Sequence, residues 1–186
     1  MNLLLAWLPV GMSYGIAFGA RTQVPLIALL LASAVWLLFL PNAPYLLTDV
    51  VHVHNFHNAT PGLIAGGLGV LAATGCVLFF ISVATMRGAA TLRVGHRAAR
   101  WVVPLCAWTS SAGMYVGRVL RWNSWDVVNR PIALLEHAAT HFADPATAAV
   151  AIALTASCAL LLQGVYVVLS GWASPDRTTH APRRSW

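Results

Sequence analysis

The sequence predicts an all-α integral membrane protein, a helical bundle of about five transmembrane helices. Of its 186 residues, 59% are hydrophobic and only 9% are charged, and the mean hydropathy is +0.72. Soluble domains carry about 25% charged residues on average, so this chain lacks the polar side chains that would cover a globule in water. Apolar stretches of about twenty residues also recur along it, the length that a helix needs to cross a bilayer.

The expected spans follow directly from these apolar stretches. They cover residues 2–20, 24–40, 61–86, 101–120 and 146–172. The first two are separated only by a short segment around Arg21, so we expect them to form a helical hairpin. The opening stretch, MNLLLAWLPV, is expected to remain as a span, because no basic residue precedes it and Phe18 interrupts the small-residue pattern of a cleavage site. Residues 1–172 are therefore expected to form one transmembrane domain, and residues 173–186 a short, basic, disordered tail.

The distribution of arginine predicts the orientation. All eleven basic residues other than histidine are arginines, and a five-span arrangement puts eight of them on one side of the membrane: Arg21, Arg87, Arg93, Arg97, Arg100, Arg177, Arg183 and Arg184. Basic residues in short loops stay in the cytoplasm. We therefore expect a multi-pass membrane protein with its N-terminus outside and its C-terminus in the cytoplasm. The loop 87–100 either only sets this topology or forms an amphipathic helix on anionic lipid.

Composition and spacing exclude several other classes. A pI near 10 would favour nucleic acid in a soluble protein, but here the arginines lie between apolar stretches and no nucleic-acid motif is present, so no nucleic-acid partner is expected. Cys76, Cys106 and Cys158 fall in three different apolar stretches without CxxC spacing. We interpret them as small buried residues that indicate no redox compartment.

Two polar segments are expected to emerge together on the outer face. They are LPNAPYLLTDVVHVHNFHN (residues 40–58), after the second span, and GRVLRWNSWDVVNRP (residues 117–131), after the fourth. In the first segment, Pro41 and Pro44 each lack a backbone donor and restrict the preceding residue, so the second span should end or break there. The polar side chains of Asn42, Tyr45, Thr48 and Asp49 then either line a polar cavity or belong to a rigid turn.

The second segment contains a pair of arginines one helical turn apart. Arg118 and Arg121 are costly in hydrocarbon unless they face the bundle, pair or reach the interface. Asp49 and Asp126 are the natural counter-charges. The cluster is then either a cap of ion pairs that holds helix ends together or an anion-binding site, to which Asn42, Asn123 and Ser124 add hydrogen-bonding groups.

The histidines allow two further interpretations. Asp49 and His52 are three residues apart and would be neighbours on a helix, which makes them the candidate catalytic pair. His137 and His141 are four apart on one side of a short amphipathic helix, and an HxxxH pair is a fragment of some metal sites. A metal or haem site would use His52, His54, His137 and His141. The alternative is that these are ordinary surface histidines, and no cofactor is otherwise expected.

Two segments resemble a known family. WLLFLPNAPYLLTDVVH (residues 36–52) and GMYVGRVLRWNSWDVVNRP (residues 113–131) are similar to the signature segments of a family of small bacterial membrane proteins catalogued as a domain of unknown function. The resemblance implies a multispan inner-membrane protein but no particular activity, substrate or cofactor. The polar residues that it shares are Asn42, Pro44, Tyr45, Thr48, Asp49, His52, Arg118, Arg121, Asn123, Ser124 and Asp126. His54, His57, His137 and His141 fall outside both segments, which weakens the metal hypothesis.

The leading functional hypothesis is an outer-face polar pocket that binds a small anionic or lipid-head-group ligand. An enzymatic version, acting on a lipid-linked phosphate, would use His52 as general base oriented by Asp49, with the arginines stabilising negative charge. A small-solute transporter, a metal- or haem-binding protein and a structural partner in a membrane assembly are the alternatives. The expected spans contain few polar residues, which counts against transport. The ligand and the oligomeric state are left open by the sequence.

Overall fold

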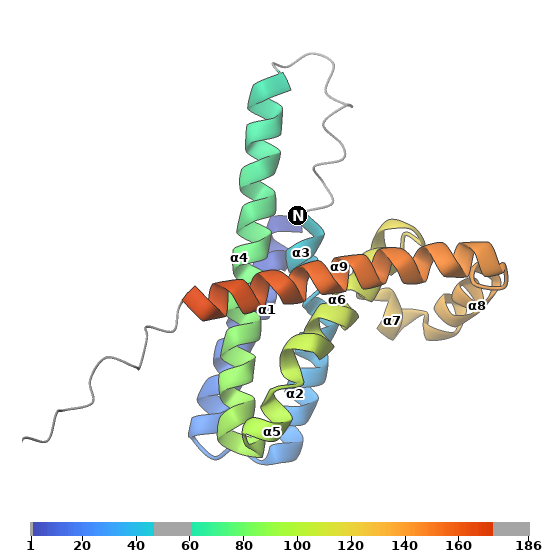
Figure 1. Cartoon of the computed structure of the whole chain (residues 1–186). Coiled ribbons are helices and arrows are strands. Elements are labelled where there is room, and N and C mark those ends of the chain that lie inside the picture. Colours follow the sequence, from blue (N-terminus) through green and yellow to red (C-terminus); the bar gives the residue numbers. More distant parts are fainter. Residues whose placement is uncertain (1, 47–60, 173–186) are drawn as a thin grey trace, which may run out of the picture.

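A computed structural model describes residues 2–46 and 61–172, and the regular structure in these ranges is entirely helical (Figure 1). The helices are α1 (Asn2–Arg21), α2 (Leu26–Phe39), α3 (Asn42–Tyr45), α4 (Pro61–Val94), α5 (His96–Ala99), α6 (Val102–Arg118), α7 (Asp126–Asn129), α8 (Pro131–His141) and α9 (Pro145–Trp172). Helices α1, α2, α4, α6 and α9 form where the apolar stretches predicted helical spans. The structure is thus the all-helical one that the sequence predicts.

Helix α1 packs along α4 and forms the predicted hairpin with α2. Its buried face consists of residues three or four apart with small or β-branched side chains: Ala6, Val10, Ser13, Ala17 and Ala20. Small side chains let two helices approach closely, which is how helices associate in a medium where burial from water provides no driving force. Phe79 and Val83 of α4 are buried in the same core cluster.

A buried polar contact joins the first three long helices. The indole of Trp36 in α2 donates to the carbonyl oxygen of Pro9 in α1 (3.1 Å) and to Oγ of Ser82 in α4 (2.9 Å). The Ser82 hydroxyl in turn donates to the same Pro9 carbonyl, at 2.9 Å. A proline inside an apolar helix is tolerated where neighbouring helices supply such hydrogen bonds. The contact fixes the relative height of α1, α2 and α4.

Helix α4 continues beyond the predicted end of the third span. We expected a loop or a separate surface helix over residues 87–100, which is wrong: α4 extends to Val94, and Gly95, with φ of 87°, separates it from the short α5. Arg93 explains the extension. Its guanidinium donates to Val24 O (2.9 Å), to Gln23 Oε1 (3.1 Å) and to Ala20 O (3.4 Å), so it holds the end of α4 against the α1–α2 turn.

Within the described ranges, three helical stretches are long and apolar enough to cross a membrane: Leu26–Tyr45, Gly66–Val94 and Pro145–Gly171. Helices α1 and α6 form at the other two predicted spans, and the count of five spans stays a prediction. Helix α9 packs on α6, and its Tyr166 ring contacts Phe80 of α4 (6.3 Å between centroids). In Figure 1 it crosses α4 rather than running alongside it, so the predicted spans are not all parallel.

Candidate functional site

The helix that begins at Leu26 is interrupted after Phe39 and resumes as α3. Pro41 and Pro44 lack backbone donors, yet Leu40 and Pro41 keep right-handed helical angles (φ −55° and −58°). The second span is therefore broken in its hydrogen bonding but does not turn away from its course. Asn42 and Tyr45 are both half-buried on this continuation.

Glycines on two neighbouring helices make room for α3. A Cβ atom at Gly75 of α4 would collide with the backbone carbonyl oxygen of Ala43. On the other side, a Cβ atom at Gly113 of α6 would lie 2.5 Å from Cγ of Pro41, and one at Gly117 would lie 3.2 Å from Cε2 of Tyr45. The α3 backbone therefore lies between α4 and α6 at distances that these glycines permit.

The chain leaves α6 through a tight reversal. Val119 N–H donates to Tyr115 O (2.8 Å) and Trp122 N–H to Val116 O (3.3 Å), while Arg121 adopts a left-handed conformation with φ of 58°. This reversal directs residues 122–126 back toward α3. A following turn is closed from both sides, because Asp126 N–H donates to Asn123 O (2.9 Å) and Asn123 N–H donates to Asp126 Oδ2 (2.8 Å).

The two polar segments meet where this turn reaches α3. The side-chain amide of Asn42 donates to Oγ of Ser124 at 3.3 Å and to Phe39 O at 2.9 Å. Phe39 also contacts Trp125, with ring centroids 4.9 Å apart in an edge-to-face arrangement. The structure therefore brings together residues that lie 82 positions apart in the sequence.

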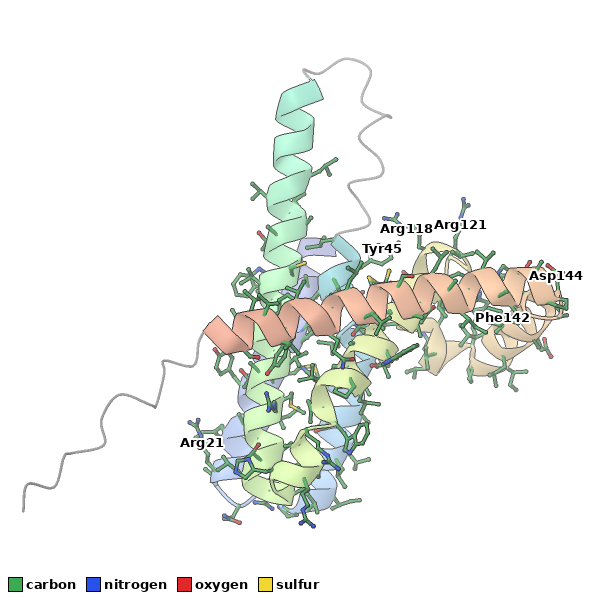
Figure 2. All side chains as sticks on the ribbon, in the orientation of Figure 1. Arg21, Tyr45, Arg118, Arg121, Phe142 and Asp144 are labelled. Atoms are coloured by element: carbon green, nitrogen blue, oxygen red, sulfur yellow. The ribbon has the colours of Figure 1, made fainter. Side chains whose placement is uncertain are left out.

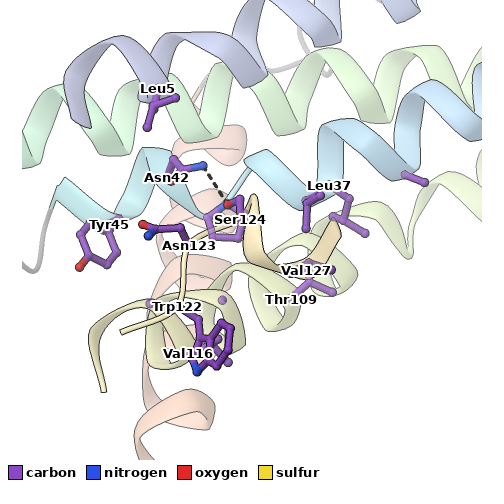
Figure 3. A pocket seen from close by; sticks show the side chains of 15 residues that line it. Leu5, Leu37, Asn42, Tyr45, Thr109, Val116, Trp122, Asn123, Ser124 and Val127 are labelled. Atoms are coloured by element: carbon purple, nitrogen blue, oxygen red, sulfur yellow. Dashed lines mark hydrogen bonds between the residues drawn. The ribbon is translucent and has the colours of Figure 1, made fainter. Parts of the chain in front are cut away.

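A cavity of about 490 Å³ lies at this junction, between α2, α3, α6 and the 122–127 segment (Figure 3). Its polar or aromatic lining residues are Asn42, Tyr45, Thr109, Trp122, Asn123 and Ser124. Figure 3 shows Tyr45 and Asn123 at one end of the cavity and Leu37 and Val127 at the other. The amide groups of Asn42 and Asn123 thus lie at the α3 end of the cavity, and the aliphatic side chains of Leu37 and Val127 lie at the α2 end, where Thr109 is also found.

Several polar atoms at the α3 end keep hydrogen-bonding capacity. Ser124 Oγ accepts from Asn42, which leaves its O–H as a donor. The side chain of Asn123 makes no hydrogen bond within the described part of the chain, so its amide can both donate and accept. Thr109 differs, because its hydroxyl donates to Leu105 O of its own helix at 2.7 Å. Asn123 and Ser124 are therefore the lining residues best able to hold a ligand oxygen.

Arg118 lies against a wall of this cavity. Its guanidinium carbon is 4.8 Å from the centroid of the Tyr45 ring, which is a cation–π contact. Figure 2 shows Arg118 and Arg121 on the same side of the molecule, far from Arg21. Arg121 is exposed and does not line the cavity. Among the described residues, the Asp126 carboxylate caps its own turn instead of pairing with Arg121.

His137 and His141 of α8 contact aromatic residues near the cavity. Trp122 Nε1 donates to His137 Nδ1 at 2.8 Å, and the Tyr115 hydroxyl lies 3.1 Å from His141 Nε2. Within the ranges that the structure describes, no group of three metal-ligating side chains is present. The two rings hold α8 against the end of α6, a role that the HxxxH spacing did not indicate. Tyr115 was missed altogether, because it lies within an apolar span.

The remaining predicted site residues lie outside the described ranges. These are Thr48, Asp49, His52, His54 and His57. Of the predicted ligand-binding set, the structure groups Asn42, Tyr45, Asn123 and Ser124 around the cavity, with Arg118 against Tyr45. The aliphatic half of the lining, which includes Leu37 and Val127, was not foreseen, because apolar residues in apolar spans give no signal of a cavity.

The fold and this junction define a helical membrane protein whose interrupted second helix meets the polar turn after α6. The chain belongs to the family described as "Protein of unknown function (DUF1361)", whose model matches residues 1–162. That range includes all the described residues of the cavity and both polar segments. No curated protein and no solved structure matches the chain significantly.

Proposed function

We propose that this protein is a multi-pass protein of the bacterial inner membrane that binds a small anionic molecule or lipid head group in the cavity beside α3. The observation that carries the proposal is the polar end of the cavity, where the hydroxyl of Ser124 and the amide of Asn123 lie near the Arg118–Tyr45 pair. Hydrogen bonds to a charged partner are worth about 1.5–3 kcal/mol each, more than those between neutral groups. Such donors beside an arginine favour a phosphate or carboxylate ligand.

The shape of the cavity supports an amphiphilic ligand. Its opposite end is lined by Leu37 and Val127, so a ligand with a charged head and a short apolar portion would match both ends. The proposed orientation places residues 122–126 on the outer face of the membrane, following the arginine distribution. The proposed ligand-binding set also contains residues that only the sequence supports: Thr48, Asp49, His52, Arg121 and Asp126.

A structural role is the second candidate, and one observation favours it. Helix α3 is packed closely against Gly75 of α4 and Gly113 of α6. In the structural role, its sole function is to hold these two helices apart at a fixed distance, as a wedge. In that case Asn42 and Ser124 would fix the wedge, and removing them would lower stability without changing any binding.

Calorimetric titration of the full chain in mild detergent tests the proposal. The probes are dihexanoyl phosphatidylglycerol, dihexanoyl phosphatidylcholine and inorganic phosphate. We expect the anionic lipid or phosphate to bind, and the variants Ser124→Ala, Asn123→Ala and Arg118→Gln each to raise its Kd by about tenfold. Arg130→Gln is the matched control, since Arg130 is exposed and does not line the cavity. Equal Kd values in wild type and all three cavity variants would contradict the proposal.

A further inference from the structure

A second cavity lies at the opposite end of the bundle, between α4, α6 and α9. Its volume is about 590 Å³, and its lining includes Arg87, Arg100, Trp101, Gln163 and Tyr166. The cavity lies at the end of the bundle that contains the α1–α2 turn. Arg93 is hydrogen-bonded to that turn, and Arg87, which lines the cavity, precedes Arg93 by less than two helical turns. The first cavity lies instead beside α3, where α6 ends, whereas Arg100 lies two residues before Val102, at which α6 begins. The two cavities are therefore separate.

The positive charges of the two arginines in this second cavity are not balanced by nearby carboxylates in the described part of the chain. Within the described ranges, neither the Arg87 nor the Arg100 guanidinium makes a hydrogen bond or ion pair; Arg100 contacts the ring of Trp101, 5.6 Å from its centroid. The lining contains no acid. The acids of the described ranges are Asp126, Glu136 and Asp144, all in the segment that follows α6. Two guanidinium groups around a hollow with no carboxylate create a positive potential that attracts anions.

The surroundings of the cavity match the boundary between water and lipid. Trp101 is 63% exposed and Tyr166 is 8% exposed, so one aromatic ring faces outward and the other forms the inner wall. Tryptophan and tyrosine concentrate at this depth of a bilayer. Leu105, one turn further along α6, and Val167, in the lining on α9, are both exposed. An apolar surface therefore leads away from the arginines along the two helices.

We propose that this cavity binds the phosphate head group of an anionic phospholipid. Arg87 and Arg100 hold the phosphate oxygens through paired N–H donors, and the amide of Gln163 hydrogen-bonds the head group. Trp101 and Tyr166 flank it, and the acyl chains lie on the exposed apolar faces of α6 and α9. A zwitterionic head group fits less well, because its ammonium or choline group would face two arginines. The site is independent of the ligand proposed for the cavity beside α3.

Native mass spectrometry of the full chain, released from mild detergent, tests this site. The protein is titrated with palmitoyl-oleoyl phosphatidylglycerol, with phosphatidylcholine of the same chains, and with inorganic phosphate. We expect one phosphatidylglycerol to bind the wild type at this site, in addition to any bound beside α3, and the double variant Arg87→Gln/Arg100→Gln to bind it about tenfold more weakly. Arg97→Gln is the matched control, since Arg97 is an exposed arginine nearby that does not line the cavity. It should bind like the wild type.

Further variants and ligands distinguish binding at this site from binding at the first cavity and from unselective attraction. Ser124→Ala should leave binding here unchanged, so failure at one cavity is distinguishable from failure at the other. Both arginines are exposed, and an unchanged helical circular dichroism spectrum will confirm that the double variant folds. Equal binding of the two lipids, or an equal loss in Arg97→Gln, would overturn the proposal by showing unselective or merely diffuse attraction. Inorganic phosphate binding as tightly as phosphatidylglycerol would overturn the assignment to lipid.

Discussion

The side-chain amide of Asn42 and the hydroxyl oxygen of Ser124 are 3.3 Å apart and form a hydrogen bond across 82 positions of sequence. One residue belongs to the interrupted end of the second apolar stretch and the other to the turn that follows α6. This bond links the two polar segments directly, as the contact between Arg118 and the Tyr45 ring also does, and it lies in the lining of the cavity beside α3. Its strength therefore determines how firmly one wall of that cavity is positioned.

We expect Asn42 and Ser124 to be energetically coupled. A double-mutant cycle with Asn42→Ala, Ser124→Ala and the double variant should give a coupling energy of about 0.5–1.5 kcal/mol, the usual net value of a hydrogen bond between neutral groups. The measurement is the free energy of unfolding in mild detergent. Additive effects of the two substitutions would show that the bond contributes nothing.

Gly113→Ala should destabilise the protein by about 1–3 kcal/mol, as other overpacking substitutions do. The added Cβ would lie 2.5 Å from Cγ and 2.8 Å from Cβ of Pro41, whose ring cannot rotate away. Gly69→Ala is the matched control, because nothing lies within 4 Å of the Cβ it would add to α4. The free energy of unfolding of that variant should rise by about 0.5–1 kcal/mol, because alanine is a better helix former than glycine. Thermal unfolding that ranks the two variants in the reverse order would contradict this packing.

Arg121→Gly should be more stable than Arg121→Ala by about 1 kcal/mol, because a side chain costs about that much in the left-handed region. Arg121 has φ of 58° at the reversal after α6. Both variants remove the guanidinium equally, so comparing them separates its backbone role from its charge. If Arg121 also helps bind the anion, both variants should weaken binding by the same factor in the calorimetric titration. A difference in binding without one in stability would contradict the backbone argument.

The sequence could predict the helices and the meeting of the polar segments for physical reasons. Helix length and apolarity are local properties, and so is the break caused by Pro41. Pairing across the bundle is not local, because it depends on how closely glycines such as Gly113 allow α3 to approach. The continuation of α4 to Val94 was missed because the guanidinium of Arg93 finds its partners on a distant turn. The aliphatic half of the cavity was missed because Leu37 resembles every other leucine of its span.

Two equally buried serines should respond differently to alanine. Ser82 and Ser110 are both 0% exposed. Ser82 bridges Trp36 and the Pro9 carbonyl, so Ser82→Ala removes two buried hydrogen bonds and should cost about 0.5–1.5 kcal/mol, while Trp36 Nε1 still donates to Pro9 O. Ser110 Oγ has no hydrogen-bond partner among the described residues, so Ser110→Ala should be neutral or stabilising. Unfolding free energies of the two variants check this contrast, and equal losses would contradict it.

Asp144 should make the stability of the α8–α9 junction depend on pH. It precedes Pro145 at the start of α9, and its Oδ2 accepts from the Thr147 hydroxyl (2.6 Å) and the Thr147 N–H (2.9 Å). These two bonds, the hydroxyl first, lower the pKa of Asp144 below its ordinary value of 3.8. A carboxyl group whose pKa is lowered by folding stabilises the fold above its unfolded pKa, and this contribution disappears as pH falls through the folded pKa.

Asp144→Asn also caps the helix but does not titrate. The advantage of the wild type over this variant in thermal unfolding should therefore be constant near neutral pH and shrink below about pH 3.8. A difference that stays constant on acidification would show that the cap does not depend on the charge of Asp144.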